Sequence, residues 1–219
     1  MCGKFTAMKS WREVVEFARA FTFRPEDETV TYRVMQPVPL ITFDRETGQR
    51  RILAARWGFP HPKDWKRPQP IHARAETIET TKAFAGAFLD GQRAIALVST
   101  FFEAPDVPGP TQQHVITPGE ATAIGIAFVW RSFDVGQPQP LLAACMVTVA
   151  ANTLIAGLPT DRMPAVLDAG NWATWLGERD ATVDEVKACL RTQEEPSWTM
   201  VRENTSPRKP TGSNPTGLL

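Results

Sequence analysis

The sequence predicts one α+β domain, in which a mainly antiparallel sheet is surrounded by peripheral helices. Long apolar runs separated by turn signals dominate the second half of the chain, and shorter patterns with helical spacing flank them. The 219 residues are ample for one hydrophobic core, and neither an internal repeat nor a shift in composition divides them. We therefore expect one domain over residues 1–204, followed by a flexible Pro-, Gly- and Ser-rich tail at residues 205–219.

The first half of the chain predicts helices around a hairpin. A Ser-x-x-Glu capping box precedes apolar residues at helical spacing, and two β-rich runs flank a Gly-containing turn. A stretch with four prolines and no apolar period then predicts a loop. In order, these are a helix from Ser10–Glu13 to residue 21, a hairpin of residues 38–43 and 51–57, a loop at 60–70 and a helix at 79–89.

The second half predicts longer strands, followed by short helices. The strands are apolar along most of their length, so we expect both faces of the sheet to be covered. Thr182 and Glu185 form a second capping box, which marks the start of the last helix. The predicted strands are residues 94–102, 114–117, 121–133 and 141–150, and the predicted helices are residues 152–155, 171–176 and 183–190.

Composition excludes several classes of protein. Lysine and arginine number 24 against 24 acids, which argues against nucleic-acid binding through bulk positive charge but leaves a local groove open. No apolar run approaches the roughly 20 residues of a membrane span, and no signal peptide is recognisable. The three cysteines form no CxxC pair and no even framework, so we expect no disulfide, no metal site and a cytoplasmic location. Cys145 and Cys189 fit buried apolar positions.

Cys2 directly follows Met1. Because cysteine is small, removal of Met1 is expected, and the mature chain then begins with a 1,2-aminothiol. The amine (pKa about 8) can attack an aldehyde to form an imine, and the thiol (pKa about 8.5) can close on the imine carbon to form a thiazolidine. The thiol can instead attack an acyl carbon with the amine as base, as in N-terminal-nucleophile enzymes. A cysteine present at this position by chance is the third interpretation.

The stretch from Arg50 to Arg74 is basic within an otherwise neutral chain. Trp57, Phe59 and Trp65 are interleaved with its charges. Phosphates need cations and unstacked bases need aromatic faces, so this composition is typical of a single-stranded nucleic-acid site. A solvated hairpin with core aromatics explains it equally well. The charges are Arg50, Arg51, Arg56, Lys63, Lys66, Arg67 and Arg74, against Asp64.

Two further places carry polar groups beside apolar segments. Glu103 follows a long apolar strand, where partial desolvation would raise its pKa and allow proton transfer near neutrality; a surface glutamate at a loop start is the alternative. Thr160 offers a hydroxyl beside Asp161 and Arg162, which also fit a simple turn pair.

Five short motifs follow one another along the chain. They are Met-Cys-Gly-Lys-Phe at residues 1–5, Arg-Trp-Gly-Phe-Pro at 56–60, Ala-Arg-Ala-Glu-Thr at 73–77, Phe-Phe-Glu at 101–103 and Asp-Arg-Met-Pro at 161–164. In this order they resemble the motifs of the SRAP (SOS response-associated peptidase-like) family, which includes bacterial and human abasic-site proteins. The resemblance covers roughly residues 1–176.

The resemblance implies a compact, barrel-like α+β fold and a positively charged cleft for single-stranded DNA. It implies that the mature N-terminal cysteine cross-links to abasic sites through a thiazolidine, that no cofactor is needed, and that the partner is abasic or single-stranded DNA and not a membrane. A monomer is expected. The implied catalytic residues are Cys2 as nucleophile, Glu103 for proton transfer, His72 and Thr160, and the implied DNA contacts are Lys4, Arg33, Arg56, Trp57, Arg74 and Arg162.

The sequence departs from the family at two implied catalytic positions. His72 stands where the family has asparagine, and Thr160 stands where it has histidine. A histidine at 72 would restore a titratable group, whereas a threonine hydroxyl is no base near neutral pH. We therefore expect either a proton relay rebuilt around His72 and Glu103, or slow cross-linking with DNA binding retained. Two other functions stay open: a DNA-binding module without covalent chemistry, and an N-terminal-nucleophile peptidase.

Overall fold

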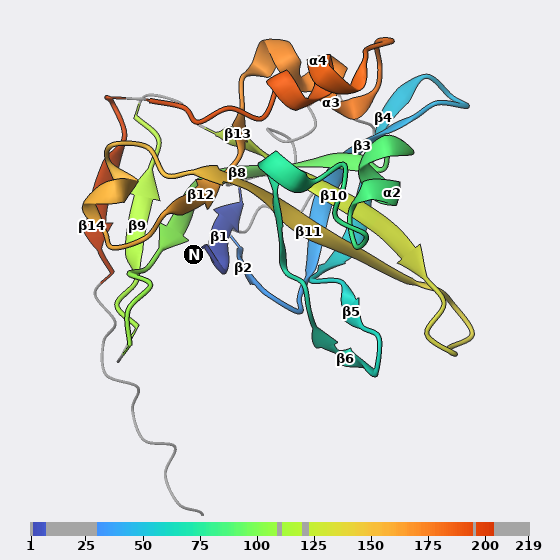
Figure 1. Ribbon diagram of the computed structural model, residues 1–219, viewed down its shortest axis with the longest axis horizontal. Coiled ribbons are helices and arrows are strands. Elements are labelled where there is room, and N and C mark those ends of the chain that lie inside the picture. Colours follow the sequence, from blue (N-terminus) through green and yellow to red (C-terminus); the bar gives the residue numbers. More distant parts are fainter. Residues whose placement is uncertain (1, 8–29, 109–110, 120–122, 195, 204–219) are drawn as a thin grey trace, which may run out of the picture.

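The computed structural model describes residues 2–7, 30–108, 111–119, 123–194 and 196–203 (Figure 1). The helix predicted from Ser10 and the tail predicted from residue 205 lie outside these residues. None of the helices in the described residues has the length and apolar character that a bilayer crossing requires.

Long strands close into a barrel at the centre of the molecule. β3 and β4 form the predicted hairpin, β3 also pairs with β8, β8 pairs with β10, and β10 pairs with β11, all antiparallel. A parallel pairing of β11 with β4 completes the ring. The predicted α+β fold with a mainly antiparallel, barrel-like core is thereby confirmed. The strands are β3 (Pro37–Asp44), β4 (Gln49–Trp57), β8 (Arg93–Glu103), β10 (Ile124–Phe133) and β11 (Leu141–Ala150).

Aromatic side chains fill the inside of the barrel. The ring of Trp57 lies 5.4 Å from that of Phe5 and 5.9 Å from that of Phe128, and all three side chains are buried. Most residues of β8 and β11 are buried regardless of alternation, because helices and short strands cover their outer faces. Because both faces of β8 and β11 are covered, their sequences are apolar along most of their length instead of alternating with polar residues.

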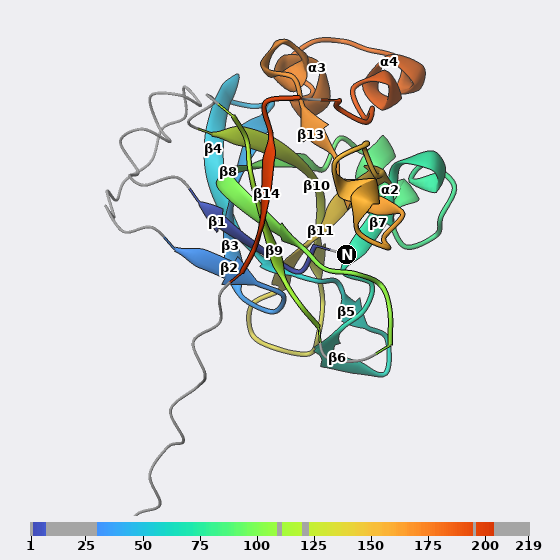
Figure 2. The ribbon, with the colours of Figure 1, turned by 90° about the vertical axis from the view of Figure 1, so that its left-hand side faces the viewer.

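Short strands attach to the edges of the barrel and bring distant parts of the chain together (Figure 2). β1 lies between β8 and β2, while β7 runs parallel to β11 and β12 pairs with β11 nearby. Only β9 among them was predicted from the sequence. The others are β1 (Lys4–Ala7), β2 (Thr31–Arg33), β7 (His72–Arg74), β12 (Arg162–Pro164), β13 (Val166–Leu167) and β14 (Thr199–Arg202), beside β9 (His114–Thr117).

The helices are shorter than the sequence predicts. The helix expected at residues 79–89 begins only at Ala85, because the preceding residues form turns in which the Thr80 hydroxyl donates to the carbonyl of Thr77. The capping box of Thr182 and Glu185 forms with both of its hydrogen bonds. The helices are α2 (Ala85–Leu89), α3 (Trp172–Leu176) and α4 (Val183–Ala188), and the 3₁₀ turns are η1 (Ala75–Thr77), η2 (Ile155–Gly157) and η3 (Ala169–Asn171).

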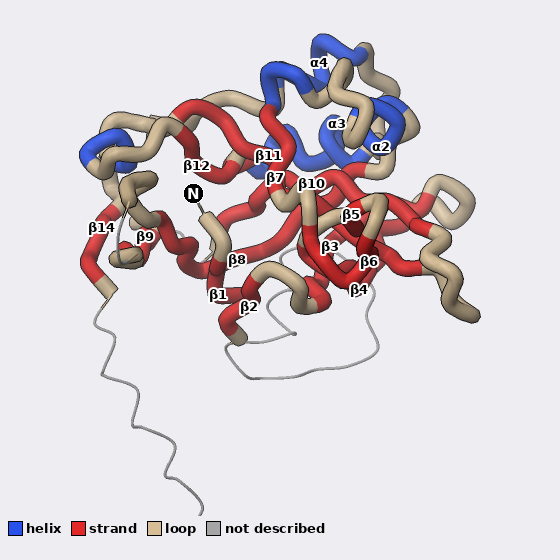
Figure 3. The backbone as a smooth tube through the Cα atoms, turned by 60° about the horizontal axis from the view of Figure 1, so that its bottom comes forward, coloured by secondary structure: helices blue, strands red, loops and turns tan. Residues whose placement is uncertain are grey.

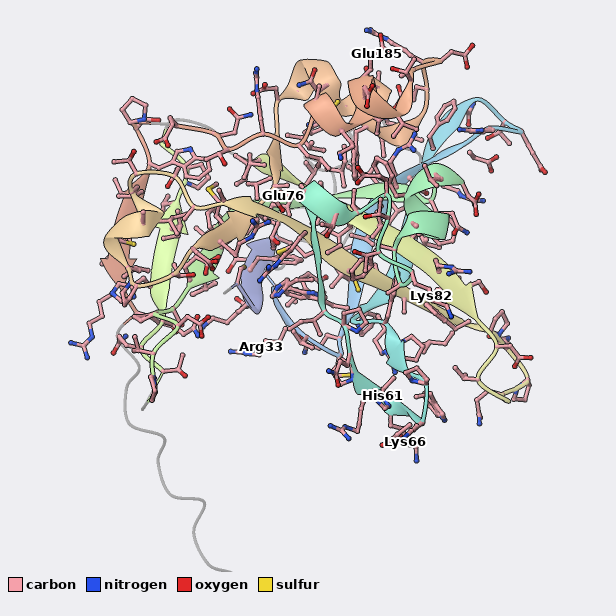
Figure 4. The ribbon with its side chains drawn as sticks, in the orientation of Figure 1. Arg33, His61, Lys66, Glu76, Lys82 and Glu185 are labelled. Atoms are coloured by element: carbon pink, nitrogen blue, oxygen red, sulfur yellow. The ribbon has the colours of Figure 1, made fainter. Side chains whose placement is uncertain are left out.

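The proline-rich residues 60–70 form a small hairpin instead of the predicted loop. β5 (Pro60–His61) pairs with β6 (Asp64–Pro68) in a separate two-stranded sheet. The prolines stand at strand ends, where a missing N–H breaks no ladder. Figure 4 shows His61 and Lys66 on this hairpin, which projects from the barrel.

Candidate functional site around Cys2

Strand register places Cys2 beside Glu103. β1 runs antiparallel to β8 with Phe5 opposite Phe101, so the chain before Phe5 runs along the end of β8. The backbone N–H groups of Cys2 and Ala104 face the Glu103 carboxylate and favour its charged form. Figure 3 shows the first described residues entering between β8 and β12. The two residues predicted to react are therefore neighbours, although they are a hundred positions apart.

Glu103 is fully buried, with 0% of its surface exposed. Burial raises the pKa of its carboxyl to about 7, although the nearby backbone N–H groups of Cys2 and Ala104 favour the charged form. A carboxyl with this pKa exists in both protonation states near neutrality. Glu103 can consequently donate and accept a proton within one reaction cycle.

The thiol of Cys2 is buried at the same place. Its Sγ donates to the backbone carbonyl of Lys4 at 3.3 Å, and 1% of the residue is exposed. Burial and the nearby Glu103 carboxylate raise the pKa of the thiol far above its usual range. The thiol is therefore protonated at neutral pH and needs a base before it can act as a nucleophile. Beside it, the α-carbon of Gly3 faces open space.

His72 holds the backbone of Cys2 from the other side. Its Nε2 lies 2.6 Å from the carbonyl oxygen of Cys2, and because a carbonyl only accepts, Nε2 carries the proton. Burial lowers the pKa of His72 to about 4, and Arg162 contributes to the shift. The imidazole is therefore neutral at pH 7 and serves as a hydrogen-bond donor, whereas the sequence led us to expect titration near neutrality.

Thr160 lies in the segment before β12 and is 9% exposed. The preceding Pro159 accepts a hydrogen bond of 2.8 Å from the backbone N–H of Asp106, so this segment packs against the loop that follows Glu103. Within the described residues, the Thr160 hydroxyl is buried and has no hydrogen-bond partner. Its polar group is thus not used by the fold.

Two of the cations predicted to contact DNA are held by carboxylates. The Lys4 ammonium lies 2.6 and 2.8 Å from the oxygens of Glu203 and sits 3.8 Å from the centre of the Phe102 ring. The Arg162 guanidinium binds both oxygens of Glu76, at 2.7 and 2.9 Å. Both cations lie near Cys2, but each is already neutralised by a partner.

Arg56 and Trp57 are parts of the core. Arg56 donates to the carbonyls of Trp65 and Gly58, at 2.8 and 3.4 Å, and so fixes the small β5–β6 hairpin to the barrel. Trp57 is 0% exposed and donates to the carbonyl of Ile71 at 3.2 Å. These contacts give both residues a structural role, and neither presents its polar or aromatic face to solvent.

Arg33 and Arg74 are the exposed members of the predicted DNA-contacting set. Arg33 is opposite Lys4 in the β1–β2 pair, so the two side chains share a face of the sheet, and Figure 4 shows Arg33 extending away from the body of the molecule. Arg74 is two positions after His72 on β7 and therefore lies on the same face as the imidazole. Both arginines border the Cys2 site without an ion-pair partner in the described residues.

The comparisons with known proteins decide the family. The model of the SOS response associated peptidase (SRAP) family matches residues 1–206. The chain belongs to the SRAP family. Two similar curated relatives come from Bacillus subtilis strain 168: the abasic site processing protein YoqW is 26% identical over 196 residues, covering 87% of each chain. The abasic site processing protein YobE is 26% identical over 195 residues, covering 87% of this chain and 88% of its own.

Solved structures share the SRAP fold of this chain. A crystal structure of a Bacteroides thetaiotaomicron protein matches with a TM-score of 0.79 at 17% identity, over 96% of this chain and 97% of that one. A crystal structure from Bordetella bronchiseptica matches with a TM-score of 0.77 at 17% identity, over 93% and 100% of the two chains. At this level of identity, the likeness supports the fold alone.

Sequence reasoning missed the carboxylates that hold the cations of this SRAP protein. Glu203 is 199 positions from Lys4, and no local pattern marks it. Glu76 lies inside the Ala-Arg-Ala-Glu-Thr motif, but only the pairing of β7, β11 and β12 brings it to Arg162. In the described residues, no group of three His, Cys, Asp or Glu side chains is placed to hold a metal ion.

Proposed function

We propose that this SRAP protein captures abasic sites in single-stranded DNA by forming a thiazolidine through Cys2 after removal of Met1. The observation that carries the proposal is the contact of Cys2 with two groups of suited chemistry. The backbone N–H of Cys2 faces the carboxylate of Glu103, whose pKa is about 7, and His72 donates to the Cys2 carbonyl. The names of the Bacillus relatives, abasic site processing proteins, agree with this function.

The amine of Cys2 would react first. A ring-opened abasic sugar carries an aldehyde, and the amine adds to its carbon to give a carbinolamine. Protonated Glu103 then donates its proton to the carbinolamine oxygen, the C–O bond breaks with loss of water, and a protonated imine (iminium) forms. The hydrogen bond from His72 would fix the Cys2 carbonyl and so hold the amine toward Glu103.

The thiol would close the ring. Because the buried Cys2 thiol is protonated at neutral pH, it needs a base, and Glu103 has become a carboxylate by giving up its proton in the preceding step. The sulfur forms a bond to the iminium carbon, the C=N electron pair moves onto the nitrogen, which keeps its proton, and the thiol proton passes to Glu103. The net reaction joins aldehyde, amine and thiol and releases one water.

Exposed arginines at the rim would hold the DNA strand. Arg33 and Arg74 border the site from β2 and β7, and each can bind a backbone phosphate. Because Trp57 is buried, base stacking on that ring has no part in the proposal. The proposed affinity therefore rests on phosphate contacts and on the covalent bond.

The test is a denaturing-gel assay with single-stranded DNA that contains one abasic site, using protein whose Met1 is removed. Wild type should give an adduct that resists denaturant, and Cys2→Ser should give none. Cys189→Ser is the matched control, because Cys189 is a free and buried thiol on another element, and this variant should cross-link like wild type.

Three results would contradict the proposal or redirect it. An adduct in Cys2→Ser, or no adduct in processed wild type, would overturn it. Salt-sensitive DNA binding without any adduct would assign the protein as a binding module. Peptide hydrolysis that is lost in Cys2→Ser, with indifference to abasic DNA, would assign it as a peptidase.

A further inference from the structure

Two arginine side chains converge at the end of β8 that lies away from the Cys2 site. Arg93 begins β8 and Glu103 ends it, which separates the two places by roughly 30 Å along the strand. Arg45 reaches the same place from the β3–β4 turn. A Cβ built on Gly177 would lie 3.3 Å from a terminal nitrogen of each guanidinium, so the two charges approach one point.

Two nitrogens of the Arg93 guanidinium are held by backbone carbonyls, and the third, Nη2, is the one that lies near Gly177. Its Nε donates to the carbonyl of Trp175 at 2.5 Å, and one terminal nitrogen donates to the carbonyl of Phe88 at 2.8 Å. These carbonyls belong to the last turns of α3 and α2, where partial negative charge favours a cation. Hydrogen bonds to these carbonyls explain why Arg93 can be buried, with 7% of its surface exposed. They do not explain why the side chain of Arg45 lies beside it.

Arg45 is exposed and, in the part of the chain that the structure describes, makes no hydrogen bond and no ion pair. Two of the carboxylates close in sequence bind other arginines: Glu178 binds Arg50 at 2.5 and 3.1 Å, and Asp44 binds Arg51 at 3.1 Å. Burial lowers the pKa of Arg93 to about 10, and the charge of Arg45 contributes to this shift. In the described residues, no carboxylate forms an ion pair with either of these two guanidiniums.

Glycines make room between the two guanidiniums. Gly91 and Gly177 both have positive φ, +76° and +81°, and the atoms nearest to their missing Cβ positions belong to arginine side chains. The terminal nitrogen of Arg45 would lie 2.9 Å from a Cβ on Gly91. Any residue other than glycine would thus occupy the space in which the guanidinium donors meet.

We propose that Arg45 and Arg93 form a binding site for a phosphate group. Guanidinium groups bind phosphate through paired, charge-assisted hydrogen bonds, and one anion between them would neutralise their repulsion. The phosphate can be an inorganic ion or the backbone of a nucleic acid. The site shares no residue with the Cys2 site, so its test is independent of abasic-site chemistry.

The test compares wild type with Arg45→Ala and with Lys82→Ala, which removes one positive charge from an exposed side chain elsewhere (Figure 4). Thermal unfolding is followed while inorganic phosphate replaces chloride at constant ionic strength and pH. In a second arm, fluorescence anisotropy measures binding of an undamaged single-stranded oligonucleotide. Arg45 is exposed, so its replacement leaves the core intact, and at low ionic strength without phosphate it should not lower the melting temperature.

A ligand of the folded state raises the melting temperature in a concentration-dependent way. If the ligand is free phosphate, it stabilises wild type and Lys82→Ala, and Arg45→Ala loses the shift. If the ligand is a nucleic-acid backbone, Arg45→Ala weakens oligonucleotide binding several-fold relative to Lys82→Ala. Equal behaviour of the two variants in both arms, or a loss of stability in Arg45→Ala without any anion, would overturn the proposal.

Discussion

At the residue scale, burial determines the protonation state of each group around Cys2. Without its surroundings, Glu103 would be ionised at pH 7 and the Cys2 thiol would titrate near pH 8.5. Burial raises the pKa of the Glu103 carboxyl to about 7 and raises the pKa of the Cys2 thiol well above its usual range. If Glu103 and Cys2 were exposed to solvent, their pKa values would be close to the ordinary ones, and Glu103 would not exchange protons near pH 7.

Glu103→Gln should slow cross-linking by about 10²–10³-fold, because glutamine can neither donate nor accept the proton that each step transfers. In wild type, the rate should also fall as the pH rises above about 7, because Glu103 then loses the proton that imine formation needs. Single-turnover rates between pH 5.5 and 9 test both expectations. If Glu103→Gln cross-links at the wild-type rate, or if its rate still falls above about pH 7, then Glu103 is not the group that transfers the proton.

His72 should make stability depend on pH below 6.5. Its pKa is 6.5 in the unfolded chain and about 4 in the folded protein, so between these values only the unfolded chain binds the proton. The free energy of unfolding therefore falls as the pH drops from 6.5 towards 4, by roughly 3 kcal/mol for the full shift.

His72→Asn keeps a donor for the Cys2 carbonyl but does not titrate, so it should lack this fall in stability. Glu103 contributes the opposite slope between pH 4.5 and 7, since its folded pKa is raised, but it is common to both proteins. Urea unfolding at pH 7 and pH 4.5 gives the comparison. Parallel losses of stability in the two proteins would contradict the buried, neutral state of His72.

At the element scale, the strand β14 brings a carboxylate to a cation of the Cys2 site. β14 pairs with β9, and Glu203 follows it directly and binds Lys4. A DNA phosphate at Lys4 would have to displace this carboxylate. The last described segment of the chain therefore limits how many cations are free at the site.

Glu203→Gln should free Lys4 and tighten binding of an undamaged single-stranded oligonucleotide. One further phosphate contact should steepen the slope of log K against log salt by about 0.7. Fluorescence anisotropy at several salt concentrations measures both quantities. Glu79→Gln is the control, because it frees Lys187 from a similar pair on α4; equal effects of the two variants would mean that general charge, not Lys4, is responsible.

The predictable elements are those whose signals are local. β9 and β11 occur with the predicted bounds, and the hairpin and the capping box of α4 depend on turn and cap residues near in sequence. β1, β7 and β12 could not be predicted, because these short strands lack turn signals that pair them with a neighbour in sequence and depend on β8 and β11 elsewhere in the chain. The site depends on these short strands, which is why its residues were predicted from a resemblance and its ion pairs were missed.

At the scale of the whole molecule, the net charge is zero because 24 cations balance 24 acids, and burial and ion pairing decide which of these charges face solvent. The basic stretch from Arg50 to Arg74 contributes Arg56 to the core and Arg50 to an ion pair with Glu178, so only part of its charge faces solvent. Of its aromatic members, Trp57 and Phe59 are buried, whereas Trp65 is partly exposed. The stretch therefore has a structural part and an exposed part: Arg51, Lys63, Lys66, Arg67 and Arg74 are exposed, and Arg74 on β7 joins Arg33 of β2 at the Cys2 site.

The most direct test of the central claim is the intact mass of the full chain after reaction with abasic single-stranded DNA. Protein that has lost Met1 should gain the mass of the oligonucleotide less one water, as thiazolidine formation requires. Peptide mapping should place the added mass on Cys2. Processed protein whose mass stays unchanged, or an adduct on any other residue, would contradict the account.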